Sequence, residues 1–470
     1  MTMHIYNSLS RTKEELRPIE PGHVKFYTCG PTVYNFAHIG NFRAYTFEDI
    51  LRRVILYNGL RVTQVMNLTD IDDKTIRGAQ ETGVPLKSFT KPYIDAFFDD
   101  LKALNIQPAE HYPAATDHIP EMIALIAKLF ERGLAYTSED GSVYFSVDKL
   151  PGYGKLARLD RQNLRAGARV AQDEYEKESY GDFALWKAWD EGDGDVAWDS
   201  PWGRGRPGWH LECSAMSMHY LGETFDLHTG GIDNLFPHHE NEIAQSEGAT
   251  GKPFVTYWMH CAHLRVNGEK MSKSLGNFFT LRDLFEKGWS GREIRMVLIN
   301  GHYRQPLNFT FDALEAARTA LARIDECVGA LEECAGGAAP ADSVPAWAAE
   351  ARDAFTAAVN DDLNIPEAFA ALFALVRGSN SALRDSKLSA ADAATLLALF
   401  DRMDSVLGVI RFGRAARTDA VPAEITALVE ARAAARAAKE WAESDRLRDE
   451  LAAKGWEVRD SKEGQKLKKL

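Results

Sequence analysis

The feature that most restricts the fold is a strand, a Gly-Pro turn and a helix that follow one another near the N-terminus. Residues 25–29, Lys-Phe-Tyr-Thr-Cys, are rich in aromatic and β-branched side chains and predict a β-strand. Gly30-Pro31 ends this strand, and apolar side chains recur with helical spacing from His38 to Val54. Such a junction exposes backbone N–H groups and the positive end of a helix dipole, so the segment predicts an anion site at the edge of a sheet.

A second strand and a polar cluster extend the same pattern. Residues 61–68 read as a buried strand, and the polar residues 69–74 lead from its end into another helix. Open parallel sheets bind their ligands at the carboxyl ends of the strands, which is where this cluster would lie. We therefore predict an α/β fold built on a Rossmann-like parallel sheet.

Changes in composition divide the chain. Residues 113–225 contain a helix, short β-like runs and a stretch dense in Gly, Asp, Trp and Pro, which predicts an insertion that splits the sheet domain. From Phe311 the chain is helical and rich in alanine, and a polar linker at 413–422 precedes two further helices and a candidate short strand. We expect a split Rossmann-like domain over 1–310 (insertion at about 113–225), an α-helical bundle over 311–412 and a small mixed module over 422–470.

The composition indicates a reducing compartment. Five cysteines are widely scattered along the chain, which is typical of free thiols and not of a disulfide framework. No signal peptide is recognised near the N-terminus, and no apolar run approaches the roughly 20 residues of a membrane span. We expect a cytoplasmic protein with no membrane partner.

The charge is unevenly distributed. The net charge of −13 argues by itself against a nucleic-acid partner. Residues 462–470, however, hold a run of lysines in which Glu463 is the sole acid. A basic tail on an acidic body fits local contact with a polyanion, and a solvated tail is the alternative on charge alone.

Residues 270–274, Lys-Met-Ser-Lys-Ser, have the clearest link to phosphate chemistry. Lys270 and Lys273 are three residues apart among small hydroxyl side chains, and Gly268 and Gly276 stand on either side. This arrangement predicts a mobile cationic flap that neutralises a triphosphate as it reacts. The alternative is a surface turn with two solvated lysines, which the position of the pentapeptide after a split α/β domain disfavours.

Residues 236–243 place metal-binding side chains at the start of a helix. Pro237 is expected at the first helical position. His238 and Glu242 lie at i, i+4, where two side chains can hold one metal ion, and His239 with Glu242, at i, i+3, is a competing pair. An amphipathic helix start with acids near its positive end is the alternative.

Two thiols are candidates to complete such a site. Cys29 ends the first strand, and Cys213 follows Trp209 in the segment 208–214. Neither has a CxxC partner, so spacing alone does not predict a zinc site, and a lone cysteine is usually a small core residue.

These motifs together give the chain a resemblance, over nearly its whole length, to the cysteinyl-tRNA synthetases, a family of class I aminoacyl-tRNA synthetases. The class I signatures are His38-Ile39-Gly40-Asn41, the counterpart of the HIGH motif, and the KMSKS loop at 270–274. Segments that resemble the cysteine enzymes and their close relatives lie at residues 29–34, 67–74, 205–214 and 236–242.

The resemblance implies a metal site and an amino-acid pocket. The zinc ligands of the family fall on Cys29, Cys213, His238 and Glu242. Because Zn²⁺ is thiophilic, the thiolate of L-cysteine can bind it, whereas the hydroxyl of serine binds far less well. Trp209 and Thr69 would line the amino-acid pocket.

The resemblance also implies how ATP would be bound. His38, Lys270 and Lys273 would be the catalytic residues at the phosphates, with Mg²⁺ bound to the nucleotide. Further ATP contacts would come from Gly40, Asn41, Ser272 and Ser274. The cysteine carboxylate would attack the α-phosphorus and release pyrophosphate, a step that needs charge stabilisation but no general base.

The last implied step is transfer of the cysteinyl group to tRNA-Cys. In the family the helical bundle follows the catalytic domain, and a C-terminal module reads the anticodon. The resemblance further implies that the chain acts as a monomer.

Two other functions share part of this pattern. A related ligase makes the same cysteinyl-adenylate but transfers cysteine to an amino sugar in thiol biosynthesis, and the basic two-helix module near the C-terminus favours tRNA over it. A non-catalytic zinc protein that binds RNA would have no use for the phosphate loop or its two lysines.

Overall fold

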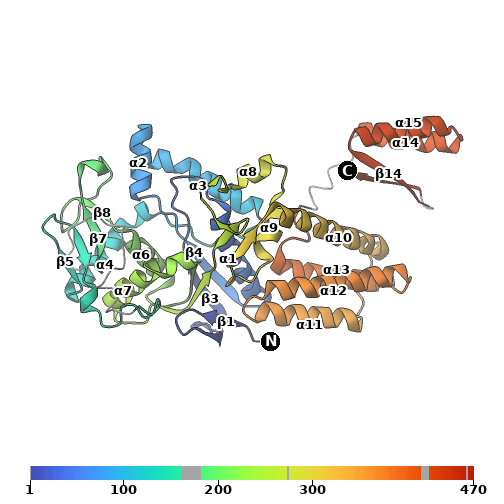
Figure 1. Ribbon diagram of the computed structural model, residues 1–470. Coiled ribbons are helices and arrows are strands. Elements are labelled where there is room, and N and C mark those ends of the chain that lie inside the picture. Colours follow the sequence, from blue (N-terminus) through green and yellow to red (C-terminus); the bar gives the residue numbers. More distant parts are fainter. Residues whose placement is uncertain (1, 160–180, 273–274, 414–422, 462–463, 470) are drawn as a thin grey trace. The chain divides into compact units, whose positions relative to one another are not determined.

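The structure is a computed structural model of the chain, and it describes residues 2–159, 181–272, 275–413, 423–461 and 464–469 (Figure 1). The chain divides into two compact units, Met1–Ile410 and Arg411–Leu470. Within these described ranges, no helix is both long and apolar enough to cross a membrane.

The first unit is built around a four-stranded parallel sheet, in the order β10 (Val255–Cys261), β9 (Phe225–Gly231), β3 (His23–Thr28), β4 (Arg61–Met66). Tyr27 pairs with Val65 of β4 on one side and with His228 of β9 on the other. The sheet therefore joins two parts of the chain that lie far apart in sequence, which confirms the predicted Rossmann-like α/β fold.

Helix α1 (Ile39–Tyr57) connects β3 to β4 and supplies much of the apolar core. Its side chains Phe42, Ile50, Leu51 and Val54 are buried, as the helical spacing predicts. Helix α6 (Trp209–Leu221) packs against β3 and β4, and helix α7 (His238–Thr250) packs against α6. These helices bring polar side chains to the carboxyl ends of the strands.

The chain between β4 and α6 adds several helices and a second sheet to the first unit. It contains α2 (Asp73–Thr82), α3 (Leu86–Ala103), the 3₁₀ turn η1 (Ala115–His118) and α4 (Ile119–Glu131). A four-stranded antiparallel sheet follows, in the order β5 (Ala135–Thr137), β6 (Val143–Phe145), β7 (Phe183–Ala188), β8 (Gly205–Pro207), with the turns η2 (Val147–Lys149) and η3 (Glu191–Asp193). Residues 160–180 of the predicted insertion lie outside the described residues.

Short elements flank the parallel sheet. The hairpin of β1 (His4–Asn7) and β2 (Thr12–Glu15) opens the chain, and η4 (Ile232–Leu235) follows β9. A three-stranded sheet is formed, in the order β12, β11, β13, by β11 (Leu264–Val266), β12 (Glu269–Lys270) and β13 (Leu307–Phe309). Helices α8 (Leu281–Glu286) and α9 (Gly291–Ile299) lie between β12 and β13 in the chain.

Four long helices complete the first unit and lie side by side in Figure 1: α10 (Phe311–Ala335), α11 (Ala346–Asn360), α12 (Ile365–Arg384) and α13 (Ala390–Leu407). Phe369, Leu372 and Val376 of α12 are buried, whereas Phe373 is half-buried. A buried polar contact joins this bundle to α1, since Arg295 donates to the Asp49 carboxylate at 2.6 Å and to the Leu407 carbonyl at 2.9 Å.

The second unit contains α14 (Ala423–Ala437), α15 (Trp441–Ala453) and a hairpin of β14 (Trp456–Ser461) and β15 (Gly464–Lys469). Ile425, Leu451 and Val458 form its small core. The short strand expected at residues 456–458 is longer than predicted, because it pairs with β15. The lysine-rich composition of the last residues gave no indication of this final strand. The predicted linker lies largely outside the described residues, which resume at residue 423.

Candidate functional site: a cavity with a thiol and histidine cluster

A cavity of about 680 Å³ lies at the carboxyl ends of the parallel strands. Its lining comes from the turn after β3, from Asn67 and Thr69 after β4, and from Trp209 at the start of α6. Segments after β9 and β10 and the end of β12 close its other sides. This is where an open parallel sheet binds ligands, as the polar cluster after residue 68 predicted.

The turn after β3 is held tightly against the chain that follows β4. The Gly30 amide donates to Asn67 Oδ1 at 2.9 Å, and the Thr69 amide donates to the Pro31 carbonyl at 3.0 Å. A Cβ on Gly30 would lie 1.8 Å from the Asn67 carbonyl oxygen, so this position requires glycine. The close approach fixes the direction in which Cys29 faces the cavity.

His38 caps helix α1 with its own ring. Its Nδ1 atom accepts the amide protons of Gly40 (3.1 Å) and Asn41 (3.3 Å), and Asn41 Oδ1 accepts the His38 amide proton in return. Burial lowers the pKa of His38, which favours the neutral ring at pH 7. Because Nδ1 accepts, the ring proton is carried by Nε2, so His38 is a neutral hydrogen-bond donor at the helix start.

The described part of the cationic flap, residues 270–272, lies beside this helix start. Lys270 ends β12, is exposed and lines the cavity. Asn277 shapes the flap, since its Oδ1 accepts the Ser272 amide proton at 2.7 Å and its Nδ2 donates to the Lys270 carbonyl at 3.2 Å. Gly40 also permits a close approach here, because a Cβ on it would lie 2.9 Å from the Met271 methyl carbon. Of the predicted phosphate-binding residues, Ser272 is not among those that line the cavity, and Lys273 and Ser274 lie outside the described residues.

Four predicted metal-ligating side chains are gathered in one place. The ligand atoms of Cys29, Cys213, His238 and Glu242 all lie within 4.8 Å of one another. The first follows β3, the second belongs to α6, and the other two lie in the first turns of α7. Their adjacency arises because α6 packs against β3 and β4, and α7 packs against α6.

Helix α7 begins one residue later than predicted. Pro237 follows a cis peptide bond and occupies the N-cap, so His238 is the first helical residue. The expectation of proline at the first helical position was therefore wrong. The i, i+4 spacing of His238 and Glu242 is unaffected, and His238 Nε2 lies 3.0 Å from Glu242 Oε1.

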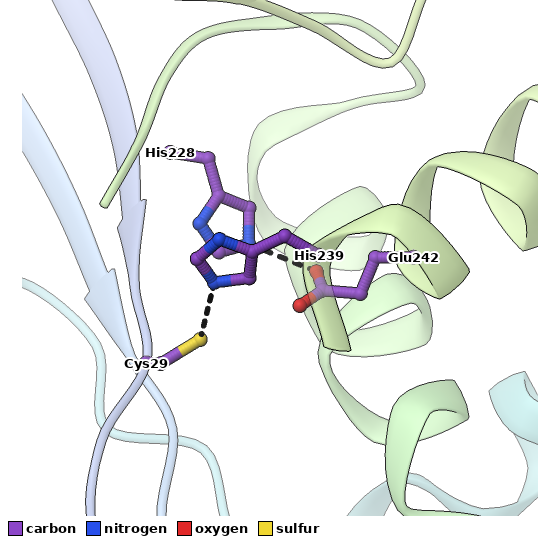
Figure 2. A group of neighbouring side chains, drawn as sticks. All are labelled: Cys29, His228, His239 and Glu242. Carbon is purple, nitrogen blue, oxygen red and sulfur yellow. Dashed lines mark hydrogen bonds and ion pairs between the residues drawn. The ribbon is translucent and has the colours of Figure 1, made fainter. Parts of the chain in front are cut away.

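A second group shares two of these residues. Cys29, His228, His239 and Glu242 also have ligand atoms within 4.8 Å of one another (Figure 2). His239 Nε2 lies 3.3 Å from Cys29 Sγ, and His228 Nε2 lies 2.8 Å from Glu242 Oε2. The geometry thus contains both histidines that the sequence left as competitors.

The surroundings distinguish the two groups. Cys29, Cys213 and His238 line the cavity, whereas His228 and His239 do not. Glu242 Oε1, the oxygen beside His238, is buried and accepts no hydrogen bond from any described residue. A buried oxygen in this state can coordinate a cation. The group with Cys213 and His238 therefore borders the cavity, and the other group lies behind it.

The protonation states fit a divalent cation of the zinc class. Burial raises the pKa of the Cys29 and Cys213 thiols, and it lowers the pKa of His238 to about 3. The imidazole is therefore neutral, as a metal ligand must be, and a bound cation would favour the thiolates. Two sulfurs, one imidazole nitrogen and one carboxylate oxygen form a donor set that suits Zn²⁺ and does not suit Mg²⁺ or Ca²⁺.

Further histidines support this cluster from behind. His210 Nδ1 lies 2.9 Å from His238 Nδ1, and His260 Nε2 lies 2.9 Å from His239 Nδ1. His260 in turn contacts the Ser8 hydroxyl at 2.8 Å. Hydrogen bonds of this kind orient ligating imidazoles. Sequence reasoning missed this network, although a histidine within an apolar strand, as at 228 and 260, is a signal that could have pointed to it.

The two predicted pocket residues lie at the cavity wall. The Trp209 ring stacks on the His238 ring, with centroids 4.4 Å apart and planes 22° from parallel. The Thr69 hydroxyl donates to Glu212 Oε2 at 2.9 Å and accepts from Asn67. Burial raises the pKa of Glu212 well above its usual value, which favours the protonated acid at this position.

Other cavity residues were not anticipated. Gly231, the last residue of β9, lines the cavity together with Asp233 and Asn234, which follow the strand. The sequence signal that could have found them is a Gly-Gly pair followed by polar residues at the end of a buried parallel strand.

Comparison with known families agrees with this geometry. Residues 15–319 match the model of the tRNA synthetases class I (C) catalytic domain, residues 354–411 match the DALR domain, and residues 418–466 match the cysteinyl-tRNA ligase anticodon binding domain.

Curated relatives match over the full length. The cysteine–tRNA ligase of Protochlamydia amoebophila (strain UWE25) is 50% identical over 470 residues, covering 99% of this chain and 98% of the relative. That of Chlamydia muridarum (strain MoPn / Nigg) is 49% identical over 483 residues and covers 100% of both chains.

Solved structures with low sequence identity share the fold. The Mycobacterium tuberculosis methionyl-tRNA synthetase in complex with methionyl-adenylate superimposes with a TM-score of 0.60 at 15% identity, covering 83% of this chain and 91% of that one. The agnB2 LeuRS of Agrobacterium radiobacter K84 gives a TM-score of 0.60 at 12% identity, covering 86% of each chain. The family models and the full-length relatives show that this chain belongs to the cysteine–tRNA ligase family of class I tRNA synthetases.

Proposed function

We propose that this chain activates L-cysteine with ATP to cysteinyl-adenylate and transfers the cysteinyl group to tRNA-Cys. The observation that carries the proposal is the make-up of one cavity. It is bordered on one side by a helix start and a cationic flap, and on the other by two thiols and an imidazole, whose ligand atoms lie within 4.8 Å of the Glu242 carboxylate. The first side suits the phosphates of ATP, and the second suits a ligand that contains sulfur.

Cys29, Cys213, His238 and Glu242 would hold Zn²⁺, and Trp209 with Thr69 would shape the pocket around the bound amino acid. The metal would supply an additional coordination position for the substrate thiolate. Serine differs from cysteine by one atom and offers only a hydroxyl, which binds zinc far more weakly. This difference supports selection of cysteine at the binding step.

On the phosphate side, the chain itself would supply donors and charge. His38 Nε2–H points away from the helix cap as a neutral donor, and it lies at the positive end of the α1 dipole. Lys270, together with Lys273 and the hydroxyls of Ser272 and Ser274 in the flap, would contact the phosphates, with Mg²⁺ carried by ATP. The cysteine carboxylate is already a nucleophile, so the chain would position it and stabilise charge.

We further propose that the chain works as a monomer in the cytoplasm. Free thiols at Cys29 and Cys213 support a reducing compartment. The match of residues 418–466 to an anticodon binding domain supports reading of the tRNA-Cys anticodon by the second unit.

Aminoacylation by the purified chain tests the function directly. With ATP, Mg²⁺ and tRNA-Cys, we expect formation of cysteinyl-tRNA from L-cysteine and at least about 100-fold less product from L-serine. A parallel measurement of pyrophosphate exchange isolates the activation step. Exchange without charging would favour transfer of cysteine to another acceptor, such as an amino sugar, and absence of both activities would contradict the proposal.

The role of His38 can be separated from its role as a helix cap. His38→Asn keeps a side-chain acceptor for the Gly40 and Asn41 amides but lacks the Nε2 donor. We expect it to lower the rate of adenylate formation about 100-fold while the urea midpoint stays unchanged. His38→Ala removes both functions and is expected to lose in addition about 1 kcal/mol of stability. Full pyrophosphate-exchange activity in His38→Asn would show that the ring serves only as a cap.

A further inference from the structure

A third group of metal-ligating side chains, separate from the two that share Cys29 and Glu242, lies outside the cavity. His118 ends η1, Glu121 lies in the first turn of α4, and His219 lies in the last turn of α6. We propose that these three residues bind a second divalent transition-metal ion of the zinc class. The proposal does not depend on the function proposed above.

The spacing of the three ligand atoms fits one ion. His219 Nδ1 lies 3.3 Å from Glu121 Oε1, His118 Nδ1 lies 3.7 Å from the same oxygen, and all three atoms lie within 4.8 Å of one another. Ligand bonds of about 2.1 Å in a tetrahedron place neighbouring donor atoms about 3.4 Å apart. Small side-chain rotations would therefore complete the site.

The state of His118 points specifically to a ligand. Its side chain is buried, with 6% of the residue exposed, and its Nδ1 atom has no hydrogen-bond partner among the residues that the structure describes. Glu121 Oε1 at 3.7 Å is too distant to accept a hydrogen bond from it. A buried polar atom without a partner is costly, and a metal ion between Nδ1 and the carboxylate would satisfy it.

Tyr220 supplies the supporting contact that a metal-binding imidazole requires. Its hydroxyl lies 3.3 Å from His118 Nε2, so the Nε2–H can donate to Tyr220 while Nδ1 keeps its lone pair for the ion. The Tyr220 ring also packs against the His118 and His219 rings, with centroids 5.5 and 4.8 Å apart.

The donor set determines the class of metal. Two imidazoles and one carboxylate suit Zn²⁺ and its neighbours in the first transition row, whereas Mg²⁺ and Ca²⁺ prefer oxygen ligands alone. Three protein ligands leave a fourth position, which water can fill.

A bound ion would cross-link two segments that are distant in sequence. The ion would connect η1 and α4, which follow α3 in the chain, to the end of α6. The same helix carries Cys213 six residues earlier, about 9 Å along its axis. The second ion would restrain this helix from a position outside the cavity.

The experiment is zinc stoichiometry on the full-length protein, dialysed against micromolar Zn²⁺ and separated from free metal. We expect His219→Ala and Glu121→Gln each to bind about one equivalent less than the wild type. His4→Ala is the matched control, since His4 is an exposed histidine far from the group in sequence, and it is expected to match the wild type. Both test positions are at least one-third exposed, so the variants are expected to fold.

Hydrogen exchange gives a second readout. Added Zn²⁺ is expected to slow exchange of the amides in η1 and in the last turn of α6 in the wild type but not in Glu121→Gln. Unchanged zinc content in both variants, or a loss confined to one of them, would overturn the proposed site. Cys213 belongs to the group at the cavity, so Cys213→Ser distinguishes the cavity site from the site proposed here. This variant is expected to keep the zinc ion bound by His118, Glu121 and His219.

Discussion

Cys213→Ser is expected to remove one bound metal ion and cysteine activation together. The change keeps the size of the side chain but replaces a thiolate, which zinc prefers, by a hydroxyl. Mutation of a residue that only hydrogen-bonds to a metal ligand typically lowers metal affinity by about 10–100-fold. Loss of a ligand itself is therefore expected to lower pyrophosphate exchange by at least about 100-fold. Bound zinc is measured by elemental analysis, and it is expected to fall by about one equivalent per chain.

Cys327→Ser is the matched control, because Cys327 is equally buried but lies in α10. It is expected to retain both zinc and exchange activity. Full activity together with full zinc content in Cys213→Ser would refute the metal role of this thiol.

The same assay decides between the two groups that share Cys29 and Glu242. His238→Asn is expected to lose the metal, whereas His239→Asn is expected to keep it with affinity reduced by about 10–100-fold, because His239 would only support the ligands. The reverse order of effects would assign the site to the group that lies behind the cavity.

Lys270→Ala is expected to slow adenylate formation by about 100- to 1,000-fold, with little change in KM for cysteine. The exposed lysine lines the cavity next to the start of α1, and its charge would be used mainly as negative charge shifts among the phosphates. A group that acts mainly in the transition state affects kcat, whereas a group that binds the amino acid affects KM. Single-turnover kinetics with ATP and cysteine measure the step directly.

Lys287→Ala serves as the control, because Lys287 is an exposed lysine at the end of α8 and lies outside the cavity. It is expected to leave the kinetics unchanged. A Lys270→Ala chain with normal kcat, or with an effect on the KM for cysteine alone, would contradict a role at the phosphates.

Local features were predictable from the sequence. The strand that ends near Cys29, the helix that begins after His38 and the buried face of α12 all follow from residue spacing within one or two turns. Such features depend on backbone propensity and on which side chains face the core. Both can be inferred from the types and spacing of residues close together in the sequence. The parallel-sheet fold could be predicted for the same reason.

The metal-ligating geometry could not be predicted from spacing. His238 and His239 are adjacent in sequence, and each can reach Glu242 along the helix, so only the packing of α7 shows that His238 faces the cavity and His239 faces His260. The resemblance pointed to His238, but the residues alone left both open. Cys29 lies 210 residues from His239, and no local pattern connects them.

The sequence by itself therefore determined the local elements and the two phosphate-related motifs, because these depend on short-range spacing. Only the tertiary structure decided which side chains meet at the ends of the strands. Its pairing of β3 with β9 and its packing of α6 against α7 set distances between residues far apart in the chain. The group of His118, Glu121 and His219 has the same origin, since helices distant in sequence bring its three ligand atoms within 4.8 Å.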